Sequence, residues 1–425
     1  MRPLLVLAAF VITFSSHSVF ANESDCGEME AWDYTKAMCM PLAMKGMPMT
    51  MVMLHFNSFF VQTVEEGRRG RSAFSVPNMF MVDAGTTAGD RHYLNAELMG
   101  TFERWTFPND GTPELLQIGE ENASHVPYLD AQHPHSSPIM GLTFSDTISL
   151  GKAKDYLQIF FAPRGQSTDG PVPFMHRPTG EVNPDAPLGH HIGQDVGHIS
   201  STVAGAALRL TNTTLEFSTF NGREPEPTKV DLPMATPNSY AARLTQVINP
   251  NFYAMASAAY LKDPEPHDPD LDHLWRYSAS LYCNHEVHGW TVQNAFIWGL
   301  INGYGQVSAL NSLAEEFLLQ QGSKNIWSRL EVLQRTPGEL DITSTAPNDP
   351  KWVTAVTVGY THNLFEWGPA NVSVGVSITK NILPAEFQPS YSGNPLSGKI
   401  FLQVGGSEGM KNVSMNHSSG GVANL

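Results

Sequence analysis

The sequence is poor in cysteine and in basic residues, and it lacks long apolar runs outside its N-terminus. Its 425 residues include 3 cysteines, and 25 lysines and arginines stand against 41 aspartates and glutamates, which gives a formal net charge of −16. This acidic balance argues against a nucleic-acid partner and permits the attraction of cations. Beyond the N-terminus no stretch approaches the roughly 18 apolar residues of a transmembrane helix, which excludes a helical inner-membrane protein.

The apolar run at the N-terminus is too short for a membrane anchor and has the order of parts of a secretory signal. Arg2 provides the positive charge, residues 4–14 form the apolar core, and residues 19–21 end in a small residue. We therefore predict a signal peptide at residues 1–21. The mature chain is one unit more acidic because Arg2 is removed with this segment.

The small number of cysteines limits the chemistry that the chain can carry. In an oxidising periplasm Cys26 and Cys39 could form a disulfide, whereas Cys283 falls on the apolar side of its segment and is predicted to be a small hydrophobic residue. No closed zinc motif, glycine-rich phosphate loop or nucleophile elbow is present. Redox chemistry therefore has no support in the sequence.

What the sequence has instead is a repeated alternation of apolar and polar residues. In the segment 370–382, for example, Val372, Val374, Val376 and Ile378 alternate with polar or small residues. Successive side chains of a strand point to opposite sides, so each such segment has one apolar face and one polar face. Strands of this length, joined by short turns at one end and long loops at the other, are typical of a transmembrane β-barrel, which leaves no open sheet edge in lipid.

The alternation predicts an all-β fold: an antiparallel up-and-down barrel of about sixteen strands. The predicted strands are 49–64, 73–84, 91–105, 139–150, 154–163, 199–211, 213–221, 239–249, 251–261, 273–285, 289–300, 309–320, 325–336, 351–363, 370–382 and 397–405. Short turns rich in Asn, Gly and Pro alternate with long loops, which include 106–138 and, as the longest and richest, 164–198. This order places both termini in the periplasm and the long loops outside the cell.

The predicted strands divide the mature chain into three parts. Residues 22–48 form a periplasmic segment with Met and Cys outside the barrel, residues 49–406 form the transmembrane barrel, and residues 407–425 form a flexible tail without a core-forming pattern. The predicted location is the cell outer membrane. The expected partners are outer-membrane lipid and lipopolysaccharide, the barrel-assembly machinery, and small solutes or metal ions, and the sequence leaves a homo-oligomer open.

The polar face of the strands predicts a polar lumen, because charge on the lipid side costs a few kcal/mol near the bilayer centre. Rows of opposite charge across a water-filled pore would sort solutes by charge, although the same charges could simply pair along the wall. The predicted pore-lining residues are Arg209, Glu216, Arg243, Arg276, Arg329 and Glu331.

Methionines near the N-terminus suggest a soft metal such as Cu(I), because thioether sulfur is a soft ligand. Alternate methionines from 47 to 53 would share one face of a strand, where an adaptable apolar edge facing lipid explains them equally well. The candidate ligands in this region are Met38, Met40, Met44, Met47 and Met49.

Histidines gather in the second and third long loops. Imidazole and carboxylate from loops that converge could bind a divalent ion, and a hydrogen-bonded loop framework is the alternative explanation. The acidic loop 263–273 could also attract cations, or bridge lipopolysaccharide through divalent ions. The candidate ligands in the histidine group are His133, His135, His190, His191, Asp195 and His198.

Several features of this chain resemble those of known outer-membrane proteins. The order of signal peptide, Met-rich segment and barrel resembles the copper-resistance outer-membrane proteins of Gram-negative bacteria. The segments 132–138, 161–166 and 189–198 resemble an uncharacterised family of bacterial outer-membrane proteins. The place of loop 164–198 resembles that of the third external loop of general porins, which folds into the barrel and narrows it. These resemblances imply an outer-membrane location and a constricted pore.

A lipid hydrolase is the main enzymatic alternative. The residues around His362 resemble the Tyr-x-His context of outer-membrane phospholipase A, which needs a nucleophilic serine two positions later. Leu364 stands at that position, so we do not expect an enzyme. The sequence therefore predicts a passive channel for small polar solutes or ions with a link to copper or another divalent metal, and a non-conducting structural barrel is a further alternative.

Overall fold

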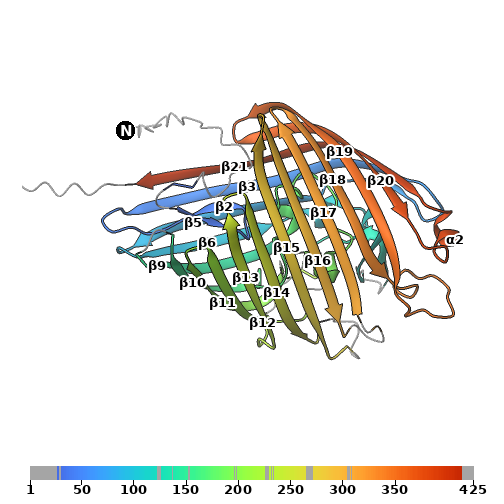
Figure 1. Ribbon diagram of the computed structural model, residues 1–425, viewed down its shortest axis with the longest axis horizontal. Helices are drawn as coiled ribbons and strands as arrows, with labels where there is room; N and C mark the ends of the chain where they lie inside the picture. The colour runs from blue at the N-terminus through green and yellow to red at the C-terminus, as the bar shows by residue number, and fades with distance from the viewer. Residues whose placement is uncertain are drawn as a thin grey trace, which may run out of the picture.

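The dominant element of the computed structural model is a closed antiparallel barrel of sixteen strands (Figure 1), as the alternation predicts. One of these strands is interrupted, since β4 and β5 follow one another along the same neighbour, β3. The structure describes residues 26–27, 30–121, 126–135, 137–151, 154–195, 197, 199–224, 229–230, 232, 234–264, 271–303, 307 and 309–413.

Each strand of the barrel pairs with the next along the chain, and the last strand closes the barrel on the first. The first three segments are β3 (Met49–Glu65), β4 (Ser72–Ser75) and β5 (Asn78–Ala88). The remaining strands are β6 (His92–Gly100), β9 (Ile139–Ser149), β10 (Tyr156–Gly165), β11 (Ser200–Leu210), β12 (Thr213–Asn221), β13 (Ser239–Asn249), β14 (Phe252–Lys262), β15 (His273–Val287), β16 (Trp290–Asn302), β17 (Ala309–Gln321), β18 (Lys324–Arg335), β19 (Lys351–Trp367), β20 (Ala370–Ile382) and β21 (Leu396–Val413).

The closing strand is longer than predicted. The sequence places the end of the barrel at residue 406, but β21 continues to Val413 and pairs with β3 from Ser397 opposite Glu65 to Val413 opposite Met49. Figure 1 shows β21 lying beside β3 along this length. The Gly- and Ser-rich composition concealed this continuation because it lacks the apolar alternation of the other strands.

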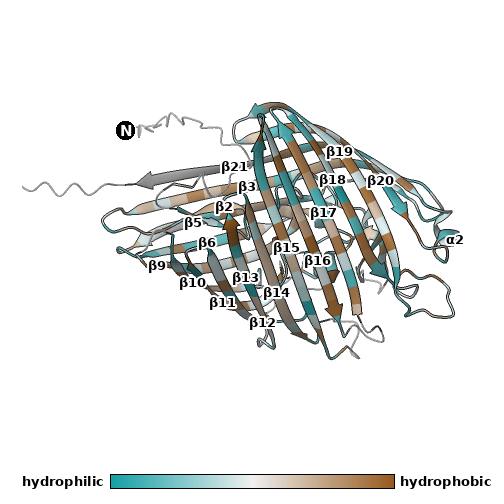
Figure 2. Ribbon diagram, in the orientation of Figure 1, coloured by the Kyte–Doolittle hydropathy of each residue, from teal (hydrophilic) through white to brown (hydrophobic). Residues whose placement is uncertain are grey.

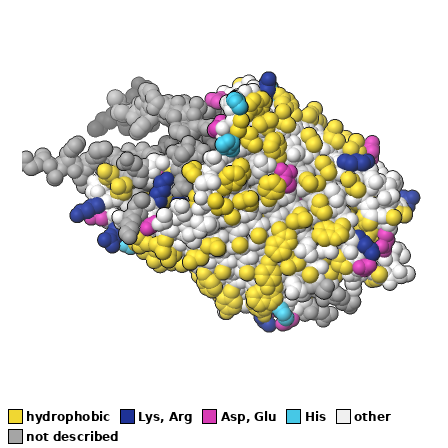
Figure 3. Space-filling view, viewed as in Figure 1, with side chains coloured by type: hydrophobic (Ala, Val, Ile, Leu, Met, Phe, Trp, Pro, Cys, Tyr) yellow, Lys and Arg dark blue, Asp and Glu magenta, His cyan; other side chains and the backbone are white. Residues whose placement is uncertain are grey.

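The strands turn their apolar faces outward and their polar faces into the lumen. On β20 the side chains of Val374, Val376 and Ile378 are exposed on the outside, whereas Ser373 and Ser377 are buried inside. The alternation of brown and teal along the strands in Figure 2 and the broad apolar surface in Figure 3 show the same arrangement. The barrel therefore has the outer surface that a lipid environment requires.

Trp327 and Glu315 are among the residues that depart from this pattern. Trp327 is a large aromatic residue that is buried inside, where its ring covers Gly359 and its indole N–H donates to Thr361 Oγ1 at 3.1 Å. A Cβ at Gly359 would lie 2.1 Å from that ring, so only glycine fits there. Glu315 is an acidic residue on the apolar outer face of β17, and its Oε1 accepts a hydrogen bond from Asn294 Nδ2 at 2.9 Å.

The N-terminal segment folds into a hairpin that lies inside the barrel. Its strands are β1 (Glu30–Asp33) and β2 (Met38–Pro41), and the predicted disulfide between Cys26 and Cys39 is confirmed. Arg209 of the wall donates to the Trp32 carbonyl at 3.1 Å, and the rings of Tyr34 and Tyr253 lie 4.6 Å apart. The prediction that Met38 and Met40 lie outside the barrel is therefore wrong.

The third long loop, here called L3 (residues 166–199), crosses the lumen, as its resemblance to the third loop of general porins implies. Most of its described residues are buried and none of them is exposed, and it contains two short helical turns, Phe174–His176 and η3 (His190–Gln194). Parts of L3 are visible between the wall strands in Figure 1. Its many Pro and Gly residues fix the backbone, so this long loop is ordered without regular structure of its own.

The second long loop, here called L2 (residues 101–138), covers the same end of the barrel. It contains α1 (Glu103–Thr106) and a hairpin of β7 (Thr112–Glu121) and β8 (Pro127–Gln132), and part of the predicted strand 91–105 belongs to α1. The buried Asp130 carboxylate ties L2 to Arg69 and to Tyr391 of α2 (Gln388–Tyr391). Within the described residues no helix is long and apolar enough to cross a membrane.

Candidate functional site

The six charged residues predicted to line a pore all lie on the inner face of the barrel, but they are closely covered. Because a water-filled channel leaves its lining accessible to water, these side chains do not border an open pore in this structure. The five residues that are 2–5% exposed are Arg209, Arg243, Arg276, Arg329 and Glu331. The sixth, Glu216, has a side chain that is 10% exposed. Their role in conduction stays a prediction.

Most of these charges pair with a neighbour or with L3. Arg243 forms two hydrogen bonds with Glu216 across adjacent strands, at 2.7 and 2.8 Å. Arg276 lies 3.4 Å from the carboxylate of Asp169 in L3, and burial raises the pKa of that carboxyl. The sequence allows two arrangements of these charges: rows that face each other across a pore, or pairs along the wall. The contacts of Arg243 and Arg276 are of the second kind, because the opposite charges lie next to each other.

L3 is anchored by a buried ion pair that the sequence analysis did not identify. Arg177 of L3 forms hydrogen bonds of 2.9 and 2.8 Å to the two carboxylate oxygens of Glu316 on β17, and Thr179 donates to the same carboxylate at 2.7 Å. Arg329 of β18 approaches Glu316 to 3.1 Å. The alternation of β17 indicates that Glu316 points into the barrel. It does not indicate the partner, Arg177, because that residue lies 139 residues away in the chain.

Further bonds attach L3 to other sides of the wall. Lys399 of β21 pairs with Asp185, and the backbone amide of Leu188 donates to Glu331 at 2.6 Å. Asn57 of β3 donates to the carbonyl of Glu181 at 2.9 Å. Together with the contact between Asp169 and Arg276 of β15, these bonds hold L3 inside the barrel against the part of the wall that runs from β15 to β3.

The candidate methionines do not gather at one place. Met44 and Met47 lie at the mouth of the barrel, where they pair with each other, and Met44 is exposed. Met49 and Met51 are buried on the inner face of β3, so the alternative that they face lipid is wrong. The thioether of Met40 accepts hydrogen bonds from Gln158 and Thr147 at 3.4 and 3.7 Å.

A different group of methionines meets inside the barrel. Met81, Met99 and Met140 form a buried cluster on neighbouring strands, and Met38 of the hairpin and Met175 of L3 pack against it. On the adjacent strand His55 is the register partner of Met81. Local sequence could not reveal this cluster, because its members come from five separate elements.

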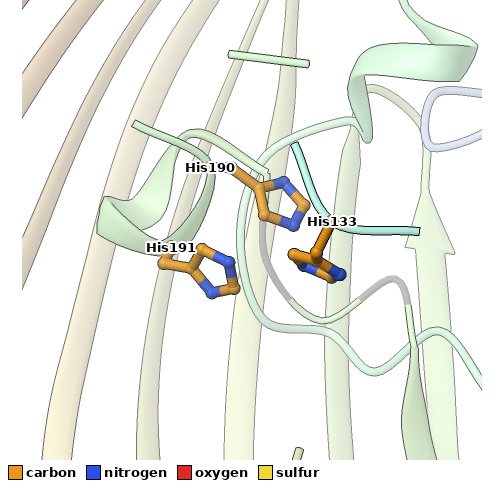
Figure 4. A group of neighbouring side chains, drawn as sticks. All are labelled: His133, His190 and His191. Carbon is orange, nitrogen blue, oxygen red and sulfur yellow. The ribbon is translucent and has the colours of Figure 1, made fainter. Parts of the chain in front are cut away.

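Three of the candidate histidines come together. His133 follows β8 in L2, whereas His190 and His191 belong to η3 in L3, and Figure 4 shows their rings grouped in one place. Each ring offers one nitrogen, and the three nitrogens lie within 4.8 Å of one another. The structure therefore brings these three candidates together, and their role as metal ligands stays a prediction.

Carboxylates stand beside two of these rings. Asp195 Oδ2 lies 3.2 Å from His190 Nδ1, and Glu224 Oε1 lies 3.7 Å from His191 Nδ1. Burial lowers the pKa of His190, and burial together with the neighbouring imidazoles holds the pKa of His133 well below its usual value. The lowered pKa favours the neutral form of both rings, which is the form in which imidazole binds a metal.

The other members of the histidine group have separate positions. The ring of His135 lies 5.6 Å from that of His133, and its Nδ1 is 2.7 Å from Glu103 Oε2. His198 lies outside the described residues. His362, considered for a hydrolase, lies near a short turn, with its Nδ1 3.2 Å from the Tyr360 hydroxyl and with Leu364 two positions further on.

Comparison with solved structures identifies the architecture. The OmpF porin of Salmonella typhi, solved with daunomycin, superposes with a TM-score of 0.53 at 7% identity, over 84% of this chain and 97% of that chain. An anion-selective porin from Comamonas acidovorans superposes with a TM-score of 0.50 at 12% identity, over 84% of this chain and 100% of that chain.

The chain has the fold of a porin-type barrel. No protein-family model and no curated protein matches its sequence. At such low identity the likeness concerns the fold alone, and the solutes of the two porins do not transfer to this protein.

Proposed function

We propose that this protein is an outer-membrane channel of the porin type, which passes small polar solutes or ions through a lumen narrowed by L3 and the N-terminal hairpin. The observation that carries the proposal is the path of L3 through a closed barrel with an apolar outside and a polar inside. L3 is bonded to charged residues of the wall. The space that remains between L3 and the wall therefore has a width and a charge that these residues determine. The apolar outer surface supports a location in the outer membrane.

The proposal is tested by reconstituting the refolded protein in planar lipid bilayers and recording single-channel currents. We expect steady ion-selective channels in the wild type. We also expect a larger conductance in Arg329→Ala, because this side chain fills space between Glu316 and the carbonyl of Asp185. Lys351→Ala is the control, since Lys351 forms its ion pair with Asp349 at the exposed rim.

Absence of single-channel current from the wild type in every lipid would overturn the proposed channel function. A non-conducting barrel would then remain, and release of fatty acid from phospholipid micelles would favour the lipid hydrolase instead. In that case the residues around His362 would be the first to substitute.

The cluster of buried methionines favours a second candidate function, the handling of Cu(I). Five methionine side chains from the hairpin, three wall strands and L3 pack together: Met38, Met81, Met99, Met140 and Met175. Thioethers suit Cu(I) in an oxidising compartment, where thiolates become disulfides. Beside them, His55 Nδ1 is buried and has no hydrogen-bond partner among the described residues.

Competition against a chromogenic Cu(I) chelator tests this candidate. The folded wild type should remove Cu(I) from the chelator, and the double variant Met99→Leu/Met140→Leu should not, because leucine preserves packing without the sulfur. Met234→Leu is the matched control at an exposed methionine. Equal retention of Cu(I) by all three proteins would assign these methionines to packing alone.

A further inference from the structure

The three histidines on L2 and L3 share the geometry of a metal site. We propose that His133, His190 and His191 bind one divalent transition-metal ion, of the Zn²⁺ class, and that this ion ties L2 to L3 above the lumen. The binding part stands on the cluster itself, whereas the effect on L3 rests on the proposed channel function. Three imidazoles with a further open position are a known ligand set for such ions.

The carboxylates orient the rings for this role. Asp195 and Glu224 stand at the Nδ1 atoms of His190 and His191, and the Nε2 of His191 lies on the other side of its ring from Glu224. Carboxylates in this position fix the tautomer of a metal-binding histidine and strengthen it as a ligand. His191 Nε2 is buried and has no hydrogen-bond partner among the described residues, although such atoms are almost always bonded in folded proteins. An ion at this point would satisfy it.

The three rings are also held in place before any ion arrives. Gly193 of η3 has φ +75°, and a Cβ there would lie 2.7 Å from the Cα of Gly299 in β16, so glycine allows η3 to rest directly on the wall. Ser312 of β17 donates to the carbonyl of Ile192 at 2.5 Å. In L2 the ring of His133 covers Gly119, where a Cβ would lie 2.8 Å from the ring. A site prepared in this way loses little entropy on binding.

The alternative is a loop framework held only by hydrogen bonds. That framework would satisfy the ring nitrogens, but His191 Nε2 has no hydrogen-bond partner among the described residues, and the carboxylate nearest to this ring lies 3.7 Å from its other nitrogen. Among the described residues, the one hydrogen bond at His133 is a long contact of 3.4 Å between its Nδ1 and the neighbouring Pro134 carbonyl. The contacts between His133 and the other two rings are therefore better explained by a shared ligand.

The binding test uses the folded full-length mature protein in detergent, stripped of metal by a chelator, with Zn²⁺ added in a calorimeter. We expect about one Zn²⁺ per chain, since three imidazoles make a single site. His133→Gln and His191→Gln should each lose this binding, and His285→Gln, at an exposed histidine near a short turn, should keep it. Glu224→Gln should bind roughly 10–100-fold more weakly because the orienting carboxylate is lost.

Each outcome decides the proposal. Absence of stoichiometric Zn²⁺, Cu²⁺ or Ni²⁺ in the wild type would overturn it, as would unchanged binding in both histidine variants. Electrophoresis of unheated samples confirms that every variant is a folded barrel, and visible absorption of the Co²⁺ form gives an independent readout of the ligands. Binding without any channel current would retain the metal site and remove the channel function. Channels whose conductance changes on Zn²⁺ only when all three histidines are present would support both.

Discussion

At the scale of single residues, the interior of this barrel is dominated by charges that are buried and paired. The side chains of Arg177 and Glu316 are both 1% exposed, yet they join a loop to a strand through two hydrogen bonds between opposite charges. Removing one partner of such a pair leaves the other charge without compensation in a low-dielectric environment. The pair of Arg177 and Glu316 therefore helps to fix the position of L3. Its loss should lower the free energy of unfolding and change the conductance.

We expect Arg177→Met to lower the free energy of unfolding by about 3–5 kcal/mol, the usual effect of breaking a buried ion pair. Urea unfolding followed by tryptophan fluorescence measures this change. Lys351→Met removes an exposed pair with Asp349 and should cost about 0–1 kcal/mol. Equal effects of the two substitutions would mean that the Arg177 pair does not hold L3.

Glu315 permits a prediction of the opposite sign. Its neighbours across the outer face, Phe296 and Leu330, are exposed apolar residues, so its carboxylate faces the surroundings of the barrel near the middle of β17. Glu315→Leu should raise the free energy of unfolding in lipid vesicles by about 1–2 kcal/mol, because acidic residues are disfavoured at that depth.

Glu286→Leu, near the end of its strand, is the control for Glu315→Leu and should change the stability by about 0–1 kcal/mol. A loss of stability in Glu315→Leu would show instead that the hydrogen bond with Asn294, or a partner chain on this face, depends on the carboxylate.

At the scale of elements, the sequence was informative where the structure repeats locally. The strands from β11 to β20 follow the alternation closely, because each has one face toward the apolar surroundings and one toward the lumen. The path of L3 through the lumen could be predicted only because L3 is the third long loop, the one that folds into the barrel in general porins. The hairpin inside the barrel could not be predicted, since its contacts join residues such as Trp32 and Arg209 that are far apart in the chain.

The histidine site could be predicted only in part, because local sequence shows the residues but not their contacts. The residue types and their two loops were visible, but the meeting of His133 with His190 and His191 depends on how L2 folds over L3. The buried methionines were harder, because Met81, Met99 and Met140 occupy separate strands and no local spacing relates them. Contacts of this kind follow from barrel closure rather than from sequence period.

The hairpin permits a prediction about conduction. Deletion of residues 26–41 removes Trp32 and Tyr34 from the lumen. Arg209 then loses its hydrogen bond to Trp32, and Tyr253 loses its ring contact with Tyr34. We expect a larger single-channel conductance in planar bilayers, with the barrel still folded because the hairpin shares no strand pairing with the wall. Lys45→Ala, at an exposed position between the hairpin and β3, is the control. An unchanged conductance would exclude the hairpin from the conducting path.

At the scale of the whole molecule, the barrel depends on one seam, the pairing of β21 with β3. This is the only contact in the described barrel that joins the two ends of the strand order, and it runs over the full length of both strands. A barrel avoids the cost of unpaired backbone groups only while this seam is complete. The Gly- and Ser-rich end of β21 is therefore part of the fold even though it lacks apolar alternation.

Truncation separates this role from that of the residues that follow. A chain ending at residue 406 loses the partners of Met49 through His55 on β3, whereas a chain ending at Val413 keeps every register pair of the seam. Each lost backbone bond is worth on the order of 0.5–1.5 kcal/mol in water and more in lipid, so the shorter chain should fold in lower yield and unfold at a lower temperature. Electrophoretic mobility after heating in detergent measures both. Because the seam closes the barrel that holds L3, the shorter chain should also give unsteady currents; equal stability of the two chains would show that closure ends at residue 406, as the alternation predicts.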